Sequence, residues 1–466
     1  MSQDRPVGPA ADAGTAINAQ SASGDLPCIE NSTALFERAG ELIPMETMLL
    51  SKHPFRMAPD AWPAYYRRAR GSRVEDVDGN VFIDFSGDVG ATILGRADPD
   101  VAAAVSRVIE HGNYCMLNYP GEVELAELLT EIIPCAECVR YARGGGEADS
   151  VAVRIARGHT RRSLVAFCGY HGWHDWYLAA NLADNEALDG HLIPGLEPLG
   201  VPRELSGTTI PFEYNDLDSL KNILAAHPGR IAAILVEPTR FTAPDEAFLT
   251  GCKELADANG AVLIFDEVVT GFRMALGGAQ EYFGVVPDIA VFAKTISNGF
   301  PMAAIVGRQE VMTVVEDQFI SSTYWTDAIG TAAAIAAITK IRETKVIDHV
   351  WSLGKTLMAG LQSAFNNAGL DAEVKGWPPF AGIVFHHQCP DMVMAMKTHF
   401  IRGMLRRGFL TTGLHYLMLT HTDEDVVNYL AAAKDALQEL NTALQRDSVM
   451  AEIDNSLATP PFRRLS

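Results

Sequence analysis

The chain has 466 residues, of which 48% are hydrophobic and 20% charged, with seven cysteines and a formal net charge of −21. This length gives room for two or three domain-sized units, and the negative charge argues against nucleic acid and anionic membranes as partners. No stretch approaches the uncharged apolar length of a membrane-spanning helix, and no secretory signal is visible. So few cysteines do not form a disulfide scaffold, so we expect a cytoplasmic protein.

The first hundred or so residues predict a tail, a helix and a hairpin. Residues 1–30 are rich in Ala, Ser, Gly, Asp and Gln, a composition typical of a disordered tail. Apolar residues recur at helical spacing within 31–50. A D-G-N turn before an alternating strand predicts a β-hairpin within 75–85. Two amphipathic helices are then expected, over 99–111 and 121–133.

A glycine-rich turn follows a short predicted strand over 138–142. The turn, Gly144-Gly145-Gly146, opens a helix that is expected to reach about His159. Backbone N–H groups at the start of a helix can bind an anion, although many such turns bind nothing. The one C-x-x-C, over 135–138, has no second cysteine pair, and we interpret its thiols as structural.

Aromatic residues gather after the next buried strand, 164–168, in the stretch GYHGWHDWY at 169–177. The ring of Tyr170 could stack on the face of a planar ligand. His171 and His174 could be metal ligands, but no third ligand accompanies them at helical spacing, so we expect no metal site.

The apolar strand 231–236 ends at Glu237, and Arg240 follows in a short polar segment. A guanidinium group can bind a carboxylate through two parallel hydrogen bonds, which makes Arg240 a candidate for holding an anionic substrate group. An arginine on the surface or in a subunit interface is an equally good interpretation.

Two short apolar runs carry the strongest chemical signal in the chain. The run 261–265 predicts a buried strand that leads directly to Asp266, and the run 288–293 leads to Lys294. In an open α/β sheet, both side chains would reach the edge where ligands bind. A poorly solvated lysine favours its neutral amine, which can form an imine with an aldehyde, and a carboxylate can hold a pyridine nitrogen protonated. These properties describe a pyridoxal phosphate (PLP) site, whereas the two residues alone could also be a buried stabilising pair.

The remaining segments with clear patterns are mainly helical. An irregular, Pro- and Gly-rich stretch precedes them at 185–210, and one apolar strand is expected over 382–385. Apolar residues at helical spacing predict helices over 217–224, 248–259, 329–343, 346–368 and 423–444.

Three long motifs resemble a known family, the class III PLP-dependent aminotransferases, and most of all its glutamate-1-semialdehyde aminomutase-like branch. They are LIFDEVVTGFR at 263–273, PDIAVFAKTISNGFPMAAIVG at 287–307 and LTHTDEDV at 419–426, and the similarity runs from about Pro44 to Gln445. The resemblance implies an α/β protein with the PLP-dependent transferase fold type I. Such a fold has a large domain, with a mostly parallel central sheet flanked by helices, and a smaller α+β domain.

The resemblance also divides the chain into domains. It implies that residues 31–90 form the N-terminal part of the small domain, 91–335 the large PLP-binding domain, and 336–447 the C-terminal part of the small domain. Residues 1–30 and 448–466 are then expected to be tails.

Site residues follow from the same resemblance. Lys294 would be the Schiff-base lysine and the general acid and base, and Asp266 would be the partner of the ring nitrogen. A threonine that matches Thr323 reaches the phosphate of the neighbouring subunit in the family, which implies a homodimer with shared active sites. The other positions that match cofactor-binding residues are Gly145, Gly146, Tyr170, Glu237 and Val268.

The chain departs from the family at places that concern the phosphate and the substrate. The family usually has hydroxyl residues where Gly144 and Gly146 stand, and an aromatic residue of the aminomutases is replaced by Val89. Segment 414–421 lacks the arginine by which some relatives hold a carboxylate. We therefore expect an aminotransferase that moves an amino group between a small-molecule donor and a keto or aldehyde acceptor. A PLP-dependent aminomutase, or a PLP lyase, is the alternative.

Overall fold

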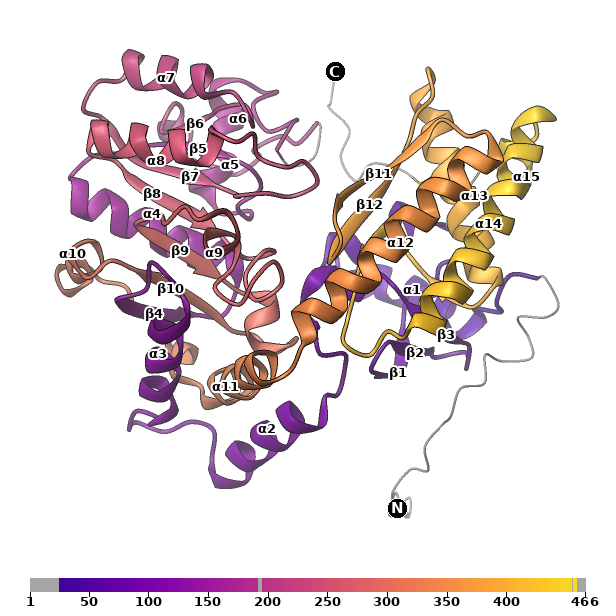
Figure 1. The fold of residues 1–466 in the computed structure, drawn as a ribbon, viewed down its shortest axis with the longest axis horizontal. Coiled ribbons are helices and arrows are strands. Elements are labelled where there is room, and N and C mark those ends of the chain that lie inside the picture. Colours follow the sequence, from indigo (N-terminus) through magenta and orange to yellow (C-terminus); the bar gives the residue numbers. More distant parts are fainter. Residues whose placement is uncertain (1–24, 192–194, 455, 459–466) are drawn as a thin grey trace.

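A computed structural model of the chain describes residues 25–191, 195–454 and 456–458. Most of the predicted N-terminal tail, residues 1–24, lies outside the described residues. Figure 1 shows a large sheet with its helices on one side of the molecule and a smaller group of strands and long helices on the other. The smaller part combines segments from near both ends of the chain.

The large sheet has seven strands in the order β4-β10-β9-β8-β7-β5-β6. Strand β10 runs antiparallel to its neighbours β4 and β9, and the other neighbouring pairs are parallel. This mostly parallel arrangement confirms the predicted fold class. The strands are β4 (Cys138–Ala142), β5 (Leu164–Cys168), β6 (Thr209–Pro211), β7 (Ile231–Val236), β8 (Val262–Asp266), β9 (Ile289–Phe292) and β10 (Ala303–Gly307).

Helices cover both faces of this sheet, which explains why its inner strands are apolar rather than alternating between apolar and polar residues. Ile264 of β8 packs in one hydrophobic cluster with α4 (Gly145–Thr160), and Phe265 packs in another with α8 (Phe248–Asn259). The other helices of this part are α2 (Pro99–His111), α3 (Gly121–Ile132), α5 (Asp175–Leu178), α6 (Ala180–Ala183), α7 (Leu217–Ala226), α9 (Ala279–Phe283), α10 (Gln309–Met312) and α11 (Ala328–Glu343).

The smaller part contains two sheets and long amphipathic helices. Its first sheet pairs β3 with the distant strand β13 in parallel, so the predicted hairpin β2–β3 is joined to the C-terminal region. The strands are β1 (Tyr66–Arg70), β2 (Arg73–Asp76), β3 (Val81–Asp84) and β13 (Phe409–Leu410), then β11 (Ala372–Trp377), β12 (Phe380–Phe385) and β14 (Leu414–Tyr416). The helices are α1 (Glu30–Leu42), α12 (Val346–Ala368), α13 (Pro390–Arg406), α14 (Asp423–Gln445) and α15 (Val449–Glu452).

Arg273 ties the loop after β8 to the smaller part. Its side chain is fully buried and donates hydrogen bonds to the carbonyl oxygens of Gly90 (3.1 Å), Pro379 (3.2 Å) and Leu417 (3.0 Å). Burial lowers the pKa of Arg273 to about 10. A buried cation held by three distant carbonyl groups fixes the smaller part against the edge of the large sheet on which Asp266 lies.

The helix predicted within 31–50 is present as α1, but it ends at Leu42, and the backbone is extended from Ile43. The expected tail 448–466 begins with α15, whose residue Val449 is buried against the core. Across the described residues, the structure shows no helix that is both long enough and apolar enough to cross a membrane.

Candidate active site

Three neighbouring parallel strands end at one edge of the large sheet and bring acidic and basic side chains together. Asp266 is the last residue of β8, and Lys294 follows β9 and begins the 3₁₀ helix η6 (Lys294–Ser297). Strands β8 and β9 pair directly, with Asp266 opposite Val291. Glu237 follows β7, the neighbour of β8 on its other side. The predicted convergence of Asp266 and Lys294 at one sheet edge is therefore confirmed.

Lys294 has a strained backbone and a perturbed amine. Its φ of 52° lies in the left-handed region, which is uncommon for residues other than glycine. The hydroxyl of Thr295 donates to the carbonyl oxygen of Gly90 at 2.9 Å and helps to hold this turn. Burial lowers the pKa of Lys294 to about 8, while the charges of Glu237 and Asp266 act in the opposite direction. The amine is therefore more readily neutral than that of an ordinary lysine.

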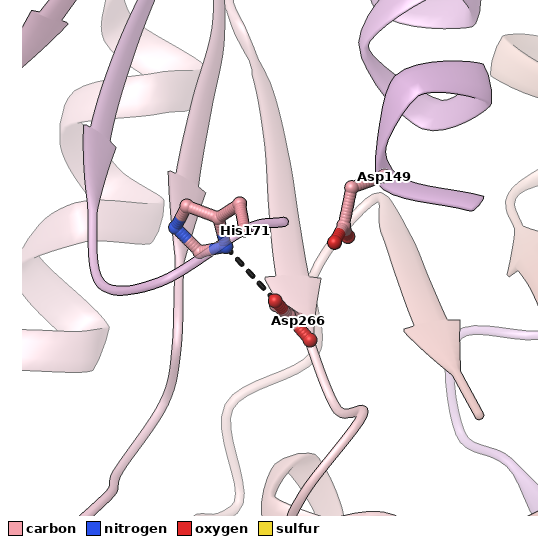
Figure 2. Close-up of side chains that lie close together, drawn as sticks. All are labelled: Asp149, His171 and Asp266. Atoms are coloured by element: carbon pink, nitrogen blue, oxygen red, sulfur yellow. Dashed lines mark hydrogen bonds and ion pairs between the residues drawn. The ribbon is translucent and has the colours of Figure 1, made fainter. Parts of the chain in front are cut away.

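Asp266 is held on both of its oxygens. The backbone N–H of Val268 donates to Oδ1 at 3.0 Å, and Nδ1 of His171 lies 2.9 Å from Oδ2 (Figure 2). His171 is itself fully buried, with Nε2 3.3 Å from the carbonyl oxygen of Cys168. His171 is thus a site residue that the sequence interpretation missed. The available signal was its place just after a buried strand.

The glycine-rich turn forms a close-packed, uncapped helix start. Helix α4 begins at Gly145, and no side chain caps it at Gly144. A Cβ on Gly145 would lie 3.0 Å from the side chain of Val268, and one on Gly146 would lie 3.1 Å from Cα of Gly172. The N–H groups in the first turn of a helix have no partner within it. Glycine therefore lets this donor-rich turn approach the end of β8.

His174 lies beside the same turn. Its Nδ1 is buried, has no hydrogen-bond partner among the described residues, and lies 3.4 Å from where a Cβ of Gly146 would be. Burial lowers the pKa of His174, although Glu147 and Asp175 oppose this shift. A buried ring nitrogen without a partner is free to meet a group that binds at the start of α4.

Tyr170, Glu237 and Arg240 form the adjoining part of the site. The backbone N–H of Tyr170 donates to Oε2 of Glu237 at 2.9 Å, and Tyr170 as a residue remains 37% exposed. Nη1 of Arg240 lies 3.9 Å from the same Glu237 oxygen, and its side chain is 48% exposed. Among the described residues the Arg240 guanidinium makes no hydrogen bond, and its charge reaches Lys294, whose pKa it lowers.

Thr323 is placed differently from the other predicted residues. It is exposed at the start of the 3₁₀ helix η8 (Thr323–Thr326). The next residue, Tyr324, is also exposed, and its ring centroid lies 6.3 Å from that of Tyr114. A single chain therefore presents Thr323 on its surface, on a face that also carries aromatic side chains.

A lysine and an aspartate at the carboxyl edge of a mostly parallel sheet, beside an uncapped helix start, define a PLP-dependent enzyme of fold type I. The family aminotransferase class-III matches residues 56–444, and the chain belongs to this family. It is a PLP-dependent aminotransferase that acts on small-molecule donors and acceptors.

Individual relatives cover nearly the whole chain. A 3-aminobutyryl-CoA aminotransferase from Cloacimonas acidaminovorans (strain Evry) is 32% identical over 426 residues, which are 89% of this chain and 99% of the relative. A glutamate-1-semialdehyde 2,1-aminomutase from Roseiflexus castenholzii is 34% identical over 409 residues, 82% of this chain and 92% of the relative. A solved transaminase with PLP bound is 28% identical with a TM-score of 0.81, covering 89% of this chain and 99% of that one.

The residues present in this chain fit PLP. The first turn of α4 offers uncapped backbone donors, and the nearby Nδ1 of His174 is buried with no hydrogen-bond partner in the part of the chain that the structure describes. An anionic phosphate satisfies such groups. At the other end of the site, the hydrogen-bonded carboxylate of Asp266 can hold a proton on a ring nitrogen, and Lys294 supplies an amine. The chemistry of this donor set therefore matches both ends of the cofactor.

The lowered pKa of Lys294 predicts the pH dependence of its reactivity. We expect the rate at which an amine-directed acylating reagent modifies Lys294, in protein freed of cofactor, to rise with pH and level off above a midpoint near 8. The reason is that only the neutral amine attacks, and burial makes it neutral at lower pH. Peptide mapping by mass spectrometry gives the rate for each lysine. A midpoint near the usual lysine value of about 10.4 would show that burial does not perturb this amine.

Proposed function

We propose that this protein transfers an amino group between a donor amine and a keto or aldehyde acceptor, with Lys294 and Asp266 as its catalytic residues. The observation that carries the proposal is the convergence of these two side chains at the ends of the paired strands β8 and β9. A third acid, Glu237, lies at the end of the neighbouring strand and faces the same edge. A cytoplasmic location belongs to the proposal, and the seven free cysteines suit a reducing compartment.

PLP, when bound, supplies an aldehyde that condenses with amines and a ring that withdraws electrons from the substrate carbon. Lys294 would hold the cofactor through its amine. Its neutral amine would take a proton from the substrate carbon that bears the nitrogen and return it to the carbon at the other end of the same C–N bond. Asp266, oriented by His171 and the N–H of Val268, would keep the ring nitrogen protonated. The lowered pKa of Lys294 suits an amine that both accepts and donates a proton near neutral pH.

The remaining site residues would position the cofactor. The N–H groups of Gly145 and Gly146 would bind its phosphate, since they open α4 and no side chain of the described residues caps this helix. The partly exposed ring of Tyr170 would stack on one face of the cofactor ring. Val268, which packs against Gly145, would press on the opposite face. Glu237 would hold the Tyr170 segment in place through its backbone N–H.

An aminomutase or a lyase on the same scaffold is the second candidate. Several relatives bear the name glutamate-1-semialdehyde 2,1-aminomutase, which favours an isomerase as the alternative. Both chemistries require the same lysine and aspartate, so those residues do not separate them. Release of a keto product from the donor alone is a property of transfer and not of isomerisation.

Arg240 supports a donor or acceptor that carries an anionic group. Its guanidinium is half-exposed, makes no hydrogen bond among the described residues, and lies 3.9 Å from Glu237. Its charge acts on Lys294 and on Tyr170, so it faces the reacting end of the site. A carboxylate or phosphate of the substrate could accept two hydrogen bonds from these free donors. We propose that Arg240 selects such substrates.

A homodimer with shared active sites completes the proposal. The surface around Thr323 carries large exposed apolar side chains, a feature that marks protein interfaces. Beside it, a hollow of about 1020 Å³ is lined by α2, residues 111–120 and α11. The hollow and the apolar side chains would be covered by a second copy, whose Thr323 would then reach the phosphate. The exposed apolar residues are Tyr114, Met116, Leu117, Phe319 and Tyr324.

The first prediction from the proposed function concerns Lys294 and Asp266. We expect Lys294→Ala to lose both turnover and the borohydride-reducible attachment of PLP. Asp266→Asn should keep the fold and bind PLP, but lose at least about 100-fold in rate because an amide cannot hold the ring proton by its charge. Circular dichroism controls for folding of both variants. Detection of a keto product after the donor alone is added to the parent distinguishes amino-group transfer from isomerisation. Parent-like turnover by either variant would contradict its assigned role.

A second prediction concerns Arg240. For a donor with a carboxylate, we expect Arg240→Gln to raise KM by about tenfold or more, since charge-assisted hydrogen bonds are lost. For an amine of similar shape without the carboxylate, KM should change little. Arg67→Gln, on the exposed strand β1, is the matched control. Equal effects on both donors would show that Arg240 does not recognise the anion.

A third prediction concerns the dimer. Lys294→Ala and Thr323→Arg should each be inactive alone. If each site uses Lys294 of one chain and Thr323 of the other, a mixed dimer has one site with both lesions and one with neither. Mixing the two proteins should therefore restore part of the activity. Sedimentation should report a dimer, and an active monomer, or no recovery despite proven subunit exchange, would contradict a shared site.

A further inference from the structure

Asp149 is a buried carboxylic acid in the site, and the proposed function gives it no role. It lies in α4, the helix whose first turn contains Gly145 and Gly146, and it is 1% exposed. Figure 2 shows its carboxyl group facing that of Asp266 across the site. A carboxylate oxygen of each and a ring nitrogen of His171 all lie within 4.8 Å of one another.

The hydrogen bonds around Asp266 and Asp149 are unequal. Both oxygens of Asp266 have donors, one from the backbone of Val268 and one from His171. In contrast, Oδ1 of Asp149 is buried without any hydrogen-bond partner among the described residues. A buried carboxylate without donors is costly, and the cost disappears when the group carries a proton.

The charges that face Asp149 also disfavour its ionised form. Asp266 at the end of β8 and Glu237 after β7 are both acidic, and His171 is the third titratable group of the cluster. Among the described residues, no lysine or arginine forms an ion pair with Asp149. Burial, followed by the charges of Asp266 and Glu237, raises the pKa of Asp149 well above its usual range. Two neighbouring buried carboxyl groups commonly hold one proton between them.

We propose that Asp149 is a protonated acid whose O–H donates to the Asp266 carboxylate, so that Asp149 is a positioning residue for the group facing the ring nitrogen of the cofactor. The pair then carries one negative charge, and Asp266 is held by Asp149, His171 and the Val268 N–H together. This inference rests on the proposed role of Asp266 at the ring nitrogen. It concerns the ground state of the site and requires no transfer of atoms.

The same three side chains could instead hold a metal ion, since carboxylates and imidazole are common ligands. The contact between His171 Nδ1 and Asp266 Oδ2, at 2.9 Å, has the length of a direct hydrogen bond. This length favours a hydrogen-bonded cluster over three side chains that surround a metal ion. Metal content of the purified protein, measured by mass spectrometry, decides between the two. One equivalent of metal in the parent, lost in Asp149→Asn, would overturn the proposal.

Thermal unfolding tests the proton on Asp149. Because its pKa is raised in the folded protein, the parent loses stability as pH rises from the unfolded value of about 4 toward the raised value. Asn is neutral at every pH and can donate an N–H to Asp266. We therefore expect Asp149→Asn to melt about 1–3 °C above the parent near neutral pH. This difference in melting temperature should become smaller as the pH is lowered toward about 5.

Asp288 offers a matched control for this measurement. It is also buried, but its Oδ1 accepts hydrogen bonds from two cations, Arg308 (3.0 Å) and Lys253 (3.2 Å), whereas Asp149 has no such partner among the described residues. Asp288→Asn should lower the melting temperature, the opposite of Asp149→Asn. A decrease of similar size in both variants would show that Asp149 is ionised and would overturn the proposal.

Spectroscopy and cofactor affinity test the positioning role. Asp149→Asn should keep the pH midpoint of the visible absorbance of bound PLP, because no charge is removed, and should keep parent-like PLP affinity. Asp149→Leu, of similar size but without a donor, should lose about tenfold in affinity for PLP. A midpoint lowered by about one unit in Asp149→Asn would reveal an ionised Asp149. Equal behaviour of the Asn and Leu variants would also overturn the proposal.

Separate measurements distinguish a failure of the proposed role of Asp266 from a failure of the proposed role of Asp149. If Asp266 were not the partner of the ring nitrogen, Asp266→Asn would have a parent-like spectrum and rate, which overturns that role. The melting comparison of Asp149→Asn with Asp288→Asn can be made on protein freed of PLP. It therefore tests the shared proton independently of the cofactor.

Discussion

The parallel pairing of β8 with β9 is the constraint on which the active site depends. Because the two strands run in the same direction and are adjacent, the residues at their carboxyl ends reach one edge of the sheet. Asp266 and Lys294 occupy those ends, and both strands are buried on both faces by helices. The rigid sheet therefore holds an acid and an amine in a poorly solvated place, where their protonation differs from that in water.

The site resolves the cost of burying these groups in different ways. Asp266 receives donors from His171 and Val268, whereas the amine of Lys294 becomes easier to deprotonate. Among the described residues, Asp149 has neither a donor on Oδ1 nor a cation beside it, and a bound proton removes the cost of burying its charge. These polar groups are already hydrogen-bonded or neutral before a ligand arrives. The site therefore needs little rearrangement of its charges and dipoles during the reaction.

The two parts of the molecule are joined at the same edge. Arg273, seven residues after the end of β8 in the loop that follows Asp266, donates to carbonyl groups at Gly90, Pro379 and Leu417. Thr295, next to Lys294, donates to the same Gly90 carbonyl. The segments that follow Asp266 and contain Lys294 thus share a partner in the smaller part of the molecule, so a shift of that part would alter the positions of both side chains.

The sequence by itself determined the strands that carry Asp266 and Lys294, the helix that opens at Gly145, and the family. Short apolar runs and glycine-rich turns are local signals, and the long motifs around 263–273 and 287–307 are specific. The sequence did not indicate a role for Asp149 or His171. Asp149 resembles any polar residue of a helix, and His171 suggests only a metal ligand together with His174.

Only the tertiary structure decided which side chains meet. The crossing of α4 over the sheet brings Asp149 to Asp266, and the loop after β5 brings His171 to the same carboxylate. The sequence also did not foresee that Arg273 would bind three distant carbonyl groups, or that Val449 would be buried rather than part of a tail. These contacts join residues far apart in the chain, so no local periodicity records them, and they depend on how the helices and sheets pack.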